Sequence, residues 1–355
     1  MRTISFFLLA MIFLTPTVAV VYAGGTDREL EEKYKVTIDK KTQKAIDDGL
    51  TYLKQRQNTD GSWSSGRYSH NTAITAFALL AFMSQGHLPN QGEYGPEVAK
   101  GARFLMAAQR EGRSNDPSDG YIIGSRGGNM YCHGMATLAL AEVWGNTQDK
   151  ELKEVVQKAV KLIVNSQNRE GGWRYNPNKY GDADISVTIM QVMALRAARN
   201  AGLHVPDKTM NDALNYIVRC NDRSGGFTYQ PGNRSPGFAR TAAGMCVLFL
   251  TGKYNAKQLP KAVNYLKKNY SQRTGHYYYG MYYAAHAMHQ VGRENPKEWY
   301  DWYHKVRDEL LSRNEQSSNG SWSRRKGQNV GPEYQTSIAV IVLSVPSHYL
   351  PIFQK

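Results

Sequence analysis

Apolar residues recur at spacings of three and four along most of the chain, which predicts α-helices. One kind of helix carries a single apolar stripe, as in residues 41–55, 151–167 and 207–220. A second kind, at 71–85, 134–144 and 186–201, is apolar nearly all round and rich in small residues. Because a stripe packs on one side whereas an all-apolar helix must be buried, we expect outer and inner helices. Strand-like alternation is absent from the sequence, which indicates an all-α protein.

A short polar turn joins the outer helix to the inner helix, and this turn repeats. The segments QNTDGSW (57–63), QNREGGW (167–173) and QSSNGSW (316–322) have Gln six residues before Trp and Gly two before it. NDRSGGF (221–227) keeps the spacing, and looser copies occur at 119–121 and 274–277. The predicted aromatic anchors are Trp63, Tyr121, Trp173, Phe227, Tyr277 and Trp322. Their interval of about fifty residues is typical of a repeat architecture.

Six outer–inner helix pairs can close into a ring, an (α/α)6 toroid that forms a single domain over residues 41–355. The inner helices are then parallel, and their N-termini meet at one end of a central cavity. An open solenoid of helical hairpins is the alternative, because the sequence pattern does not show whether the first and last repeats contact each other.

The Gln–Gly–Trp turn resembles the QW repeat of squalene–hopene cyclases and the related repeats of protein prenyltransferase β subunits. The resemblance covers residues 41–346 and implies the toroid fold. It also implies a structural role for the Gln and Trp residues of the turns. Squalene cyclases have two such barrels, whereas this chain has length for one. It looks more similar to single-barrel, exported bacterial members.

The N-terminus predicts export. One Arg precedes a long apolar stretch, and Val21-Tyr22-Ala23 offers small residues where a signal peptidase reads. We expect residues 1–23 to be a signal peptide and residues 24–40 to be a linker. The apolar stretch is long, so an uncleaved membrane anchor is the alternative. The mature protein is expected in the periplasm or outside the cell.

The amino-acid composition limits the kinds of binding partner that the protein is expected to have. Hydrophobic residues make up 41% of the 355 residues, enough for a large core, and the formal net charge is +14. This charge favours anionic surfaces, including peripheral contact with a membrane, but no nucleic-acid motif accompanies it. The chain has 23 Tyr residues, which suggests an aromatic lining, and three widely spaced Cys residues that form no disulfide framework.

Polar side chains converge at the predicted N-termini of the inner helices. Residues from distant segments that meet at one cavity are a better site signal than any single motif. The candidate catalytic residues are Asp184, Asp182 and His133. The candidate binding residues are His70, Tyr131, Cys132, Arg240, Tyr279, Tyr282, Tyr283, Glu333 and Tyr334.

The segment Asp182-Ala183-Asp184-Ile185 half-matches the D-x-D-D acid motif of squalene cyclases. The resemblance puts Asp184 at the position of the proton donor, but Ile185 replaces the last acid. An Asp at a helix N-terminus is stabilised as the anion, whereas a strong acid needs a protonated carboxyl group. Helix capping by one of the two aspartates is therefore the competing interpretation.

A zinc site is a further alternative. Cys132-His133-Gly134 resembles the Cys-His-Gly segment of lanthionine-cyclase toroids, and Asp184 and His70 could complete a ligand set. The Asp-x-Cys spacing of prenyltransferases is missing, however. We expect neither a metal nor a cofactor.

Three functions follow from these features. The first is a terpene-cyclase-like toroid that binds or cyclises an apolar isoprenoid in its cavity. The second is a non-catalytic envelope toroid that binds a lipid, a peptide or a protein partner. The third is a polysaccharide hydrolase or lyase, which needs two carboxylates across a cleft. Glu333 with Asp182 or Asp184 is the candidate pair.

Overall fold

The computed structural model describes residues 24–112, 116–124, 126–270, 276–312, 315–323, 330–347, 349–350 and 352. Within these residues the chain forms thirteen α-helices and no strand. The outer helices are α2 (Lys40–Gln55), α4 (Gly95–Ala107), α6 (Lys150–Asn165), α8 (Asp207–Arg219), α10 (Leu259–Lys268) and α12 (Pro296–Leu310). The inner helices are α3 (Thr72–Met83), α5 (Met130–Thr147), α7 (Ile185–Asn200), α9 (Phe238–Leu250), α11 (Tyr277–Val291) and α13 (Pro332–Ser344).

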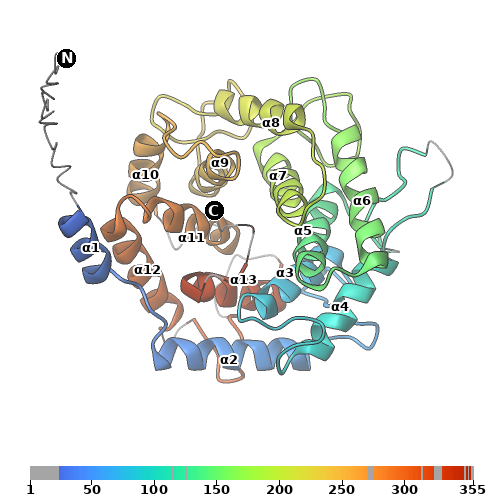
Figure 1. Ribbon diagram of the computed structural model, residues 1–355, viewed down its shortest axis with the longest axis horizontal. Coiled ribbons are helices and arrows are strands. Elements are labelled where there is room, and N and C mark those ends of the chain that lie inside the picture. Colours follow the sequence, from blue (N-terminus) through green and yellow to red (C-terminus); the bar gives the residue numbers. More distant parts are fainter. Residues whose placement is uncertain are drawn as a thin grey trace, which may run out of the picture.

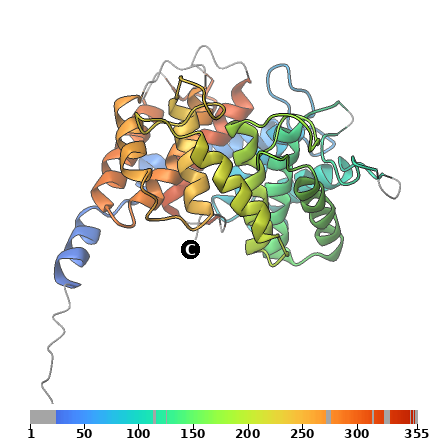
Figure 2. The same cartoon turned by 90° about the horizontal axis from the view of Figure 1, so that it is seen from above.

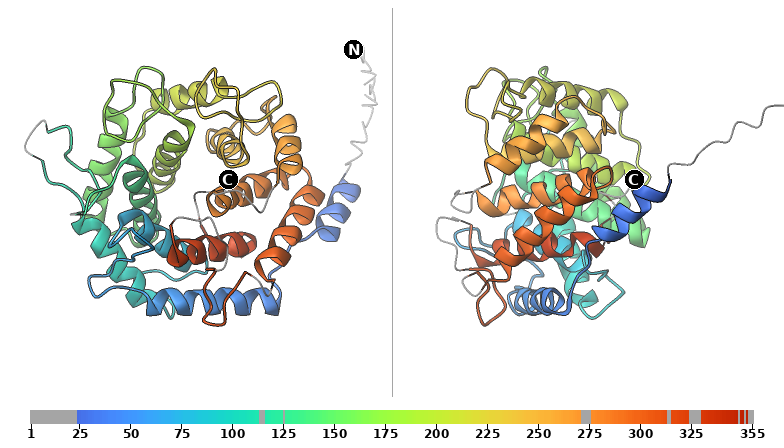
Figure 3. Two further views of the ribbon diagram at one scale, coloured as in Figure 1. Left: turned by 180° about the vertical axis from the view of Figure 1, so that it is seen from behind. Right: turned by 90° about the vertical axis from the view of Figure 1, so that its left-hand side faces the viewer.

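The helices form a closed ring. Figure 1 shows the six inner helices surrounded by the six outer helices. Each inner helix packs against the next along the chain, and α13 packs against both α2 and α3. The view from behind in Figure 3 shows the same closure. The predicted (α/α)6 toroid is therefore confirmed, and the open solenoid is excluded.

Side chains from the two ends of the chain join the ring at a seam. Gln316 Nε2 donates to the carbonyl oxygen of Ala45 on α2 at 3.0 Å. Glu333 on α13 accepts from Tyr52 Oη and Arg56 Nε, both on or next to α2 and both at 3.0 Å. Because Glu333 is buried, this contact replaces water around its carboxylate with fixed donors.

The two kinds of helix match their hydrophobic patterns. Every residue of α3 except Ala73 is buried, as expected for a helix surrounded by others. On α6, the buried side chains follow one stripe that includes Leu152, Val156 and Ile163. The burial therefore assigns outer and inner helices as the periodicity predicts.

Some helices begin earlier than predicted, at positions set by their capping residues. Helix α5 begins at Met130, four residues before the predicted start, because the Asn129 side chain accepts from the amide of Tyr131 at 2.9 Å. Helix α7 begins at Ile185, directly after its N-cap Asp184. Both observations follow the general preference for Asn and Asp at N-caps.

The repeated turns dock each hairpin onto the next outer helix. In the third turn, Gln167 Nε2 donates to the carbonyl oxygens of Gly171 at 2.8 Å and Thr209 at 2.9 Å. Trp173 Nε1 donates to Ile163 O on the preceding outer helix at 2.8 Å. Gln57 and Gln316 make equivalent bonds in their turns.

The turn glycine is needed for two reasons. Gly171 has φ +92°, and a Cβ added there would lie 2.3 Å from the carbonyl oxygen of Asp212 on α8. Only glycine combines this backbone conformation with so close an approach to a neighbouring helix.

The second turn differs from the prediction by one residue. Ile122, not Tyr121, occupies the anchor position. In the third turn, Asn168 N donates to Gly172 O, the residue directly before the anchor Trp173. In the second turn, the equivalent bond runs from Arg110 N to Tyr121 O, so the anchor is the next residue, Ile122. In the fifth repeat, residues 271–275 lie outside the described residues, and Tyr277 is the first residue of α11.

The N-terminal part lies beside the ring. The predicted signal peptide, residues 1–23, falls outside the described residues, and residues expected to be a linker contain α1 (Gly24–Lys33). The Tyr34 ring meets the Tyr300 ring of α12 at 5.7 Å, and Figure 2 shows α1 projecting away from the toroid. None of the helices in the described part of the chain is both long and apolar enough to span a membrane.

Candidate functional site: a tyrosine-lined cavity

A cavity of about 660 Å³ lies where the N-terminal ends of the inner helices converge. Its lining includes the N-cap residues Asn71 of α3, Asn129 of α5 and Gly237 of α9. The predicted position of the site, at the inner-helix N-termini, therefore corresponds to a cavity in the structure.

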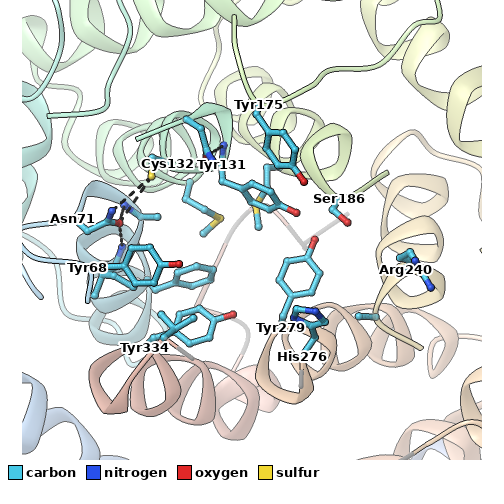
Figure 4. Close-up of a pocket in the computed structure, with 18 of the residues that line it drawn as sticks. Tyr68, Asn71, Tyr131, Cys132, Tyr175, Ser186, Arg240, His276, Tyr279 and Tyr334 are labelled. Carbon is cyan, nitrogen blue, oxygen red and sulfur yellow. Dashed lines mark hydrogen bonds between the residues drawn. The ribbon is translucent and has the colours of Figure 1, made fainter. Parts of the chain in front are cut away.

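Each of the six repeats contributes one tyrosine to this cavity. These tyrosines are Tyr68, Tyr131, Tyr175, Tyr229, Tyr279 and Tyr334. Figure 4 shows the hydroxyl groups of Tyr68, Tyr131, Tyr175, Tyr279 and Tyr334 pointing toward the middle of the ring. Burial raises the pKa of Tyr131, Tyr229, Tyr279 and Tyr334 above the usual tyrosine value, so these hydroxyls stay protonated at neutral pH.

The repeat turns aim two of these tyrosines inward. Tyr175 and Tyr229 each follow a turn anchor by two residues. Their carbonyl oxygens accept from the first amides of the preceding inner helices, Tyr175 from Met130 at 2.9 Å and Tyr229 from Ile185 at 3.0 Å. These bonds satisfy helix-end amides and hold the backbone against the cavity mouth.

Apolar side chains form the deeper part of the lining. They include Phe77, Met135 and Met190, which lie more than one turn along α3, α5 and α7. The cavity thus combines an apolar interior with hydroxyl groups nearer its mouth.

No carboxylate belongs to the cavity lining among the described residues. Asp184 is fully buried, and its Oδ1 accepts from the amides of Ser186 and Val187, both at 2.9 Å. Its Oδ2 accepts from Arg174 Nη1 at 3.2 Å. Burial raises the pKa of Asp184, whereas the amides and the guanidinium oppose that shift. Both oxygens are thus occupied, and Asp184 is the buried N-cap of α7 and is absent from the cavity lining.

Asp182 is also absent from the cavity lining. Its side chain is half exposed and accepts from Gln230 Nε2 at 2.7 Å, with Arg174 Nε at 3.7 Å. The half-match to an acid motif therefore corresponds to an ion-paired capping segment in the structure.

His133 is buried in the wall between two helices. Its Nδ1 accepts from the amide of Ile122 at 3.1 Å, and its Nε2 faces Ala159 O at 3.2 Å. The amide fixes Nδ1 as an acceptor, so Nε2 carries the proton in the neutral ring. Burial lowers the pKa of His133 to about 4. The ring bonds the backbone of the second turn and of α6 and is absent from the cavity lining.

Five of the predicted binding residues line the cavity. They are Tyr131, Cys132, Arg240, Tyr279 and Tyr334. Four others lie elsewhere. Tyr282 and Tyr283 are buried in the core, where Tyr283 Oη contacts Met190 Sδ at 3.2 Å. Glu333 belongs to the seam, and His70 Nδ1 faces Asp60 Oδ2 at 2.7 Å in the first turn.

Tyr68, Tyr175 and Tyr229 were not among the predicted site residues, and neither was Arg174, whose guanidinium lies over the rings of Tyr175 and Tyr229. A signal was present, because Tyr175 and Tyr229 occupy the same position after GGW and GGF. Residues at that position start next to the helix-end amides of the preceding repeat.

The proposed zinc ligands are not assembled. Within the described residues, no group of three His, Cys, Asp or Glu side chains is arranged to hold a metal ion. His133 uses both ring nitrogens in the wall, and Cys132 Sγ lies 3.8 Å from Asn71 Nδ2.

The ring of helix pairs and the end-on cavity define the chain as an α/α toroid. In agreement, residues 118–266 match the family model described as the prenyltransferase alpha-alpha toroid domain. A stretch of 134 residues is 30% identical to lanosterol synthase erg7A of Aspergillus fumigatus. This stretch covers 36% of the chain but only 17% of that enzyme.

Solved structures share the fold at low sequence identity. An inactive variant of the α-1,6-mannanase GH76A of Salegentibacter sp. HEL1_6, in complex with α-1,6-mannotriose, has a TM-score of 0.65 at 9% identity, covering 87% of this chain and 99% of that one. The cellobiose 2-epimerase of Bacillus thermoamylovorans B4167 has 0.66 at 12%, covering 86% and 98%.

The type II terpene cyclase MstE of Scytonema, in complex with merosterolic acid A, has a TM-score of 0.57 at 13% identity, covering 86% and 97%. These likenesses show the toroid fold alone. The resemblance to cyclases and prenyltransferases is thus confirmed at the level of the toroid and not of a particular subfamily.

Proposed function

We propose that this toroid binds an apolar, isoprenoid-type ligand in the tyrosine-lined cavity without cyclising it. The observation that carries the proposal is a cavity with an apolar interior and, in the described part of its lining, no carboxylate. Burial of an apolar chain against Phe77, Met135 and Met190 contributes about 25 cal/mol per Å² removed from water.

The environment of Asp184 supports binding without acid catalysis. A cyclase that protonates an alkene needs a protonated acid that faces its substrate. Asp184 instead caps α7 and pairs with Arg174. Export to the periplasm or beyond, which the N-terminal apolar stretch favours, belongs to the same proposal.

Oligosaccharide binding is the second candidate. Tyrosine rings can stack on sugar faces, and the Tyr131 and Tyr175 rings lie 6.2 Å apart at an interplanar angle of 28°. The mannanase named above, with mannotriose bound, has the same fold. One observation argues against a hydrolase. The two members of the predicted carboxylate pair are bound in different places, because Glu333 bonds residues of the seam whereas Asp184 caps α7 and Asp182 bonds Gln230.

Ligand binding can be tested with native mass spectrometry and calorimetry on the purified protein, using squalene, farnesol and mannotriose. We expect the isoprenoids to bind, and we expect gas chromatography to detect no cyclised product. Ala73→Trp, which fills the cavity, should weaken isoprenoid binding at least tenfold because the bulky ring occupies the ligand volume. Glu154→Trp, on the exposed face of α6, should leave affinity unchanged.

Three results contradict the proposal. Binding of mannotriose but not of isoprenoids supports the sugar candidate instead. Cyclised product from the wild type that disappears in Asp184→Asn restores the cyclase interpretation. Equal affinity of the two Trp variants would place the ligand outside the cavity.

A further inference from the structure

We propose that Tyr175, Tyr229 and Arg174 form a polar subsite at the cavity mouth that takes the uncharged oxygen of an isoprenoid alcohol. This inference rests on the proposed function and specifies its ligand class. We call these three residues the mouth subsite.

The hydroxyl groups of the mouth subsite form one hydrogen-bonded chain. Arg174 Nη1 donates to Tyr229 Oη at 3.2 Å, and Tyr229 Oη lies 2.8 Å from Tyr175 Oη. A phenolic hydroxyl has one hydrogen and accepts through its lone pairs. Tyr175 is the last member of this hydrogen-bonded series, so its hydroxyl group can still form a hydrogen bond with a ligand oxygen.

Arg174 also holds the two rings in place. Its guanidinium carbon lies 5.0 Å from the centroid of Tyr175 and 5.4 Å from that of Tyr229. Cation–π attraction on both sides, together with the bond to Tyr229, reduces the freedom of the two side chains before a ligand arrives.

The charge at the mouth subsite is already balanced. Arg174 pairs with Asp184 at 3.2 Å, and its Nε lies 3.7 Å from Asp182. Asp184 is in turn fixed by two amides of α7. A diphosphate would meet a guanidinium that is already paired and two nearby carboxylates. An uncharged hydroxyl group can use the tyrosine pair without that repulsion.

The mouth subsite is open to a ligand. Tyr175 and Tyr229 both line the cavity, and Tyr175 is 38% exposed. Figure 4 shows the hydroxyl of Tyr175 directed into the same space as those of Tyr131 and Tyr279. An apolar chain in the cavity would leave the remaining hydrogen-bonding capacity of Tyr175 unused, and an oxygen at the end of that chain removes part of this cost.

The experiment compares farnesol, the hydrocarbon farnesene and farnesyl diphosphate by calorimetry on the full chain. For the wild type we expect farnesol to bind more tightly than either of the other ligands. Tyr175→Phe and Tyr229→Phe should each lower farnesol affinity about three- to tenfold and leave farnesene affinity unchanged. Tyr180→Phe is the matched control, because Tyr180 is exposed and lies outside the cavity lining.

The outcomes separate this inference from the proposed function. If no isoprenoid binds the wild type, the proposed function fails and the subsite fails with it. If farnesol and farnesene bind equally and the two Phe variants match Tyr180→Phe, the cavity binds isoprenoids but the mouth subsite is wrong. Preference for the diphosphate overturns the assignment of an uncharged ligand oxygen.

Discussion

At the scale of single residues, His133 illustrates how one side chain can replace another in a repeat. Thr75, Thr188 and Thr241 each accept the anchor amide of their turn, and each is the fourth residue after its N-cap. His133 is the fourth residue after Asn129 and accepts the amide of Ile122. It is the second repeat's equivalent of threonine.

His133 should make stability depend on pH in a defined window. Its pKa in the folded protein is about 4, below the usual value of about 6.5, so protonation favours the unfolded chain. The stability that neutral His133 supports is present above pH 6.5 and is lost as the pH falls toward 4.

We therefore expect the stability advantage of the wild type over His133→Gln to shrink by about 2 kcal/mol between pH 7 and pH 5. Urea unfolding at both pH values measures this change. Comparison with the variant cancels other titrating groups, such as Glu142, whose pKa is raised by burial to about 8. His204→Gln, at an exposed position, should show no such change. A constant difference between wild type and His133→Gln would mean that His133 is not buried as a neutral ring.

At the scale of elements, the turns decide how neighbouring hairpins approach each other. Gly61, Gly120, Gly171 and Gly320 all have positive φ, and each lies against a carbonyl of the next outer helix around the ring. Three of these glycines follow a glutamine by four residues. In all four repeat turns, a glutamine side chain donates to the outer helix that the glycine approaches, at a carbonyl three residues nearer the N-terminus of that helix. Each repeat turn thus fixes the position of its own hairpin relative to the next outer helix.

Two glycine substitutions test this docking. Gly171→Ala places a Cβ 2.3 Å from Asp212 O, whereas Gly181→Ala, also at positive φ, meets nothing within 4 Å. We expect Gly181→Ala to cost about 1 kcal/mol of unfolding free energy through backbone strain alone. Gly171→Ala should cost about 1–3 kcal/mol more because α8 must move. Chemical denaturation measures both, and equal costs would show that the close approach to α8 contributes nothing.

At the scale of the whole molecule, the seam makes the chain a ring instead of an open array. Glu333 on α13 accepts from Tyr52 and Arg56 of the first repeat, far away in sequence. Gln316 uses the turn geometry of the other repeats to reach Ala45 on α2. Closure also brings Tyr334 of the last repeat beside Tyr68 and Phe77 of the first, which completes the cavity lining.

Removal of Glu333 should loosen the seam specifically. We expect Glu333→Ala to lower the unfolding free energy by about 2 kcal/mol, because two donors lose a buried charged acceptor. Amide hydrogen exchange should increase in α2 and α13 more than in α6 and α7. Glu298→Ala, which removes a more exposed ion pair between α10 and α12, is the control and should cost under about 1 kcal/mol. Unchanged exchange in α2 would show that the seam does not depend on Glu333.

The amino-acid sequence by itself determined the helices, their outer or inner placement and the repeated glycine turns. These features depend on local periodicity and backbone conformation, which are properties of short segments. It also indicated the end of the ring where polar side chains gather. Tyr131, Arg240 and Tyr279 were recognised correctly as part of the lining because they lie in the first turns of inner helices.

Only the tertiary structure decided which of those side chains face the cavity. Tyr279 and Tyr283 are one turn apart on the same face of α11, with ring centroids 4.9 Å apart, yet Tyr279 lines the cavity whereas Tyr283, like Tyr282, is buried in the core. Asp184 is directed to its own helix amides and to Arg174, and Tyr175 and Tyr229 reach the mouth because their backbones bond neighbouring repeats. These orientations depend on contacts between segments about fifty residues apart, which come together only when the ring closes.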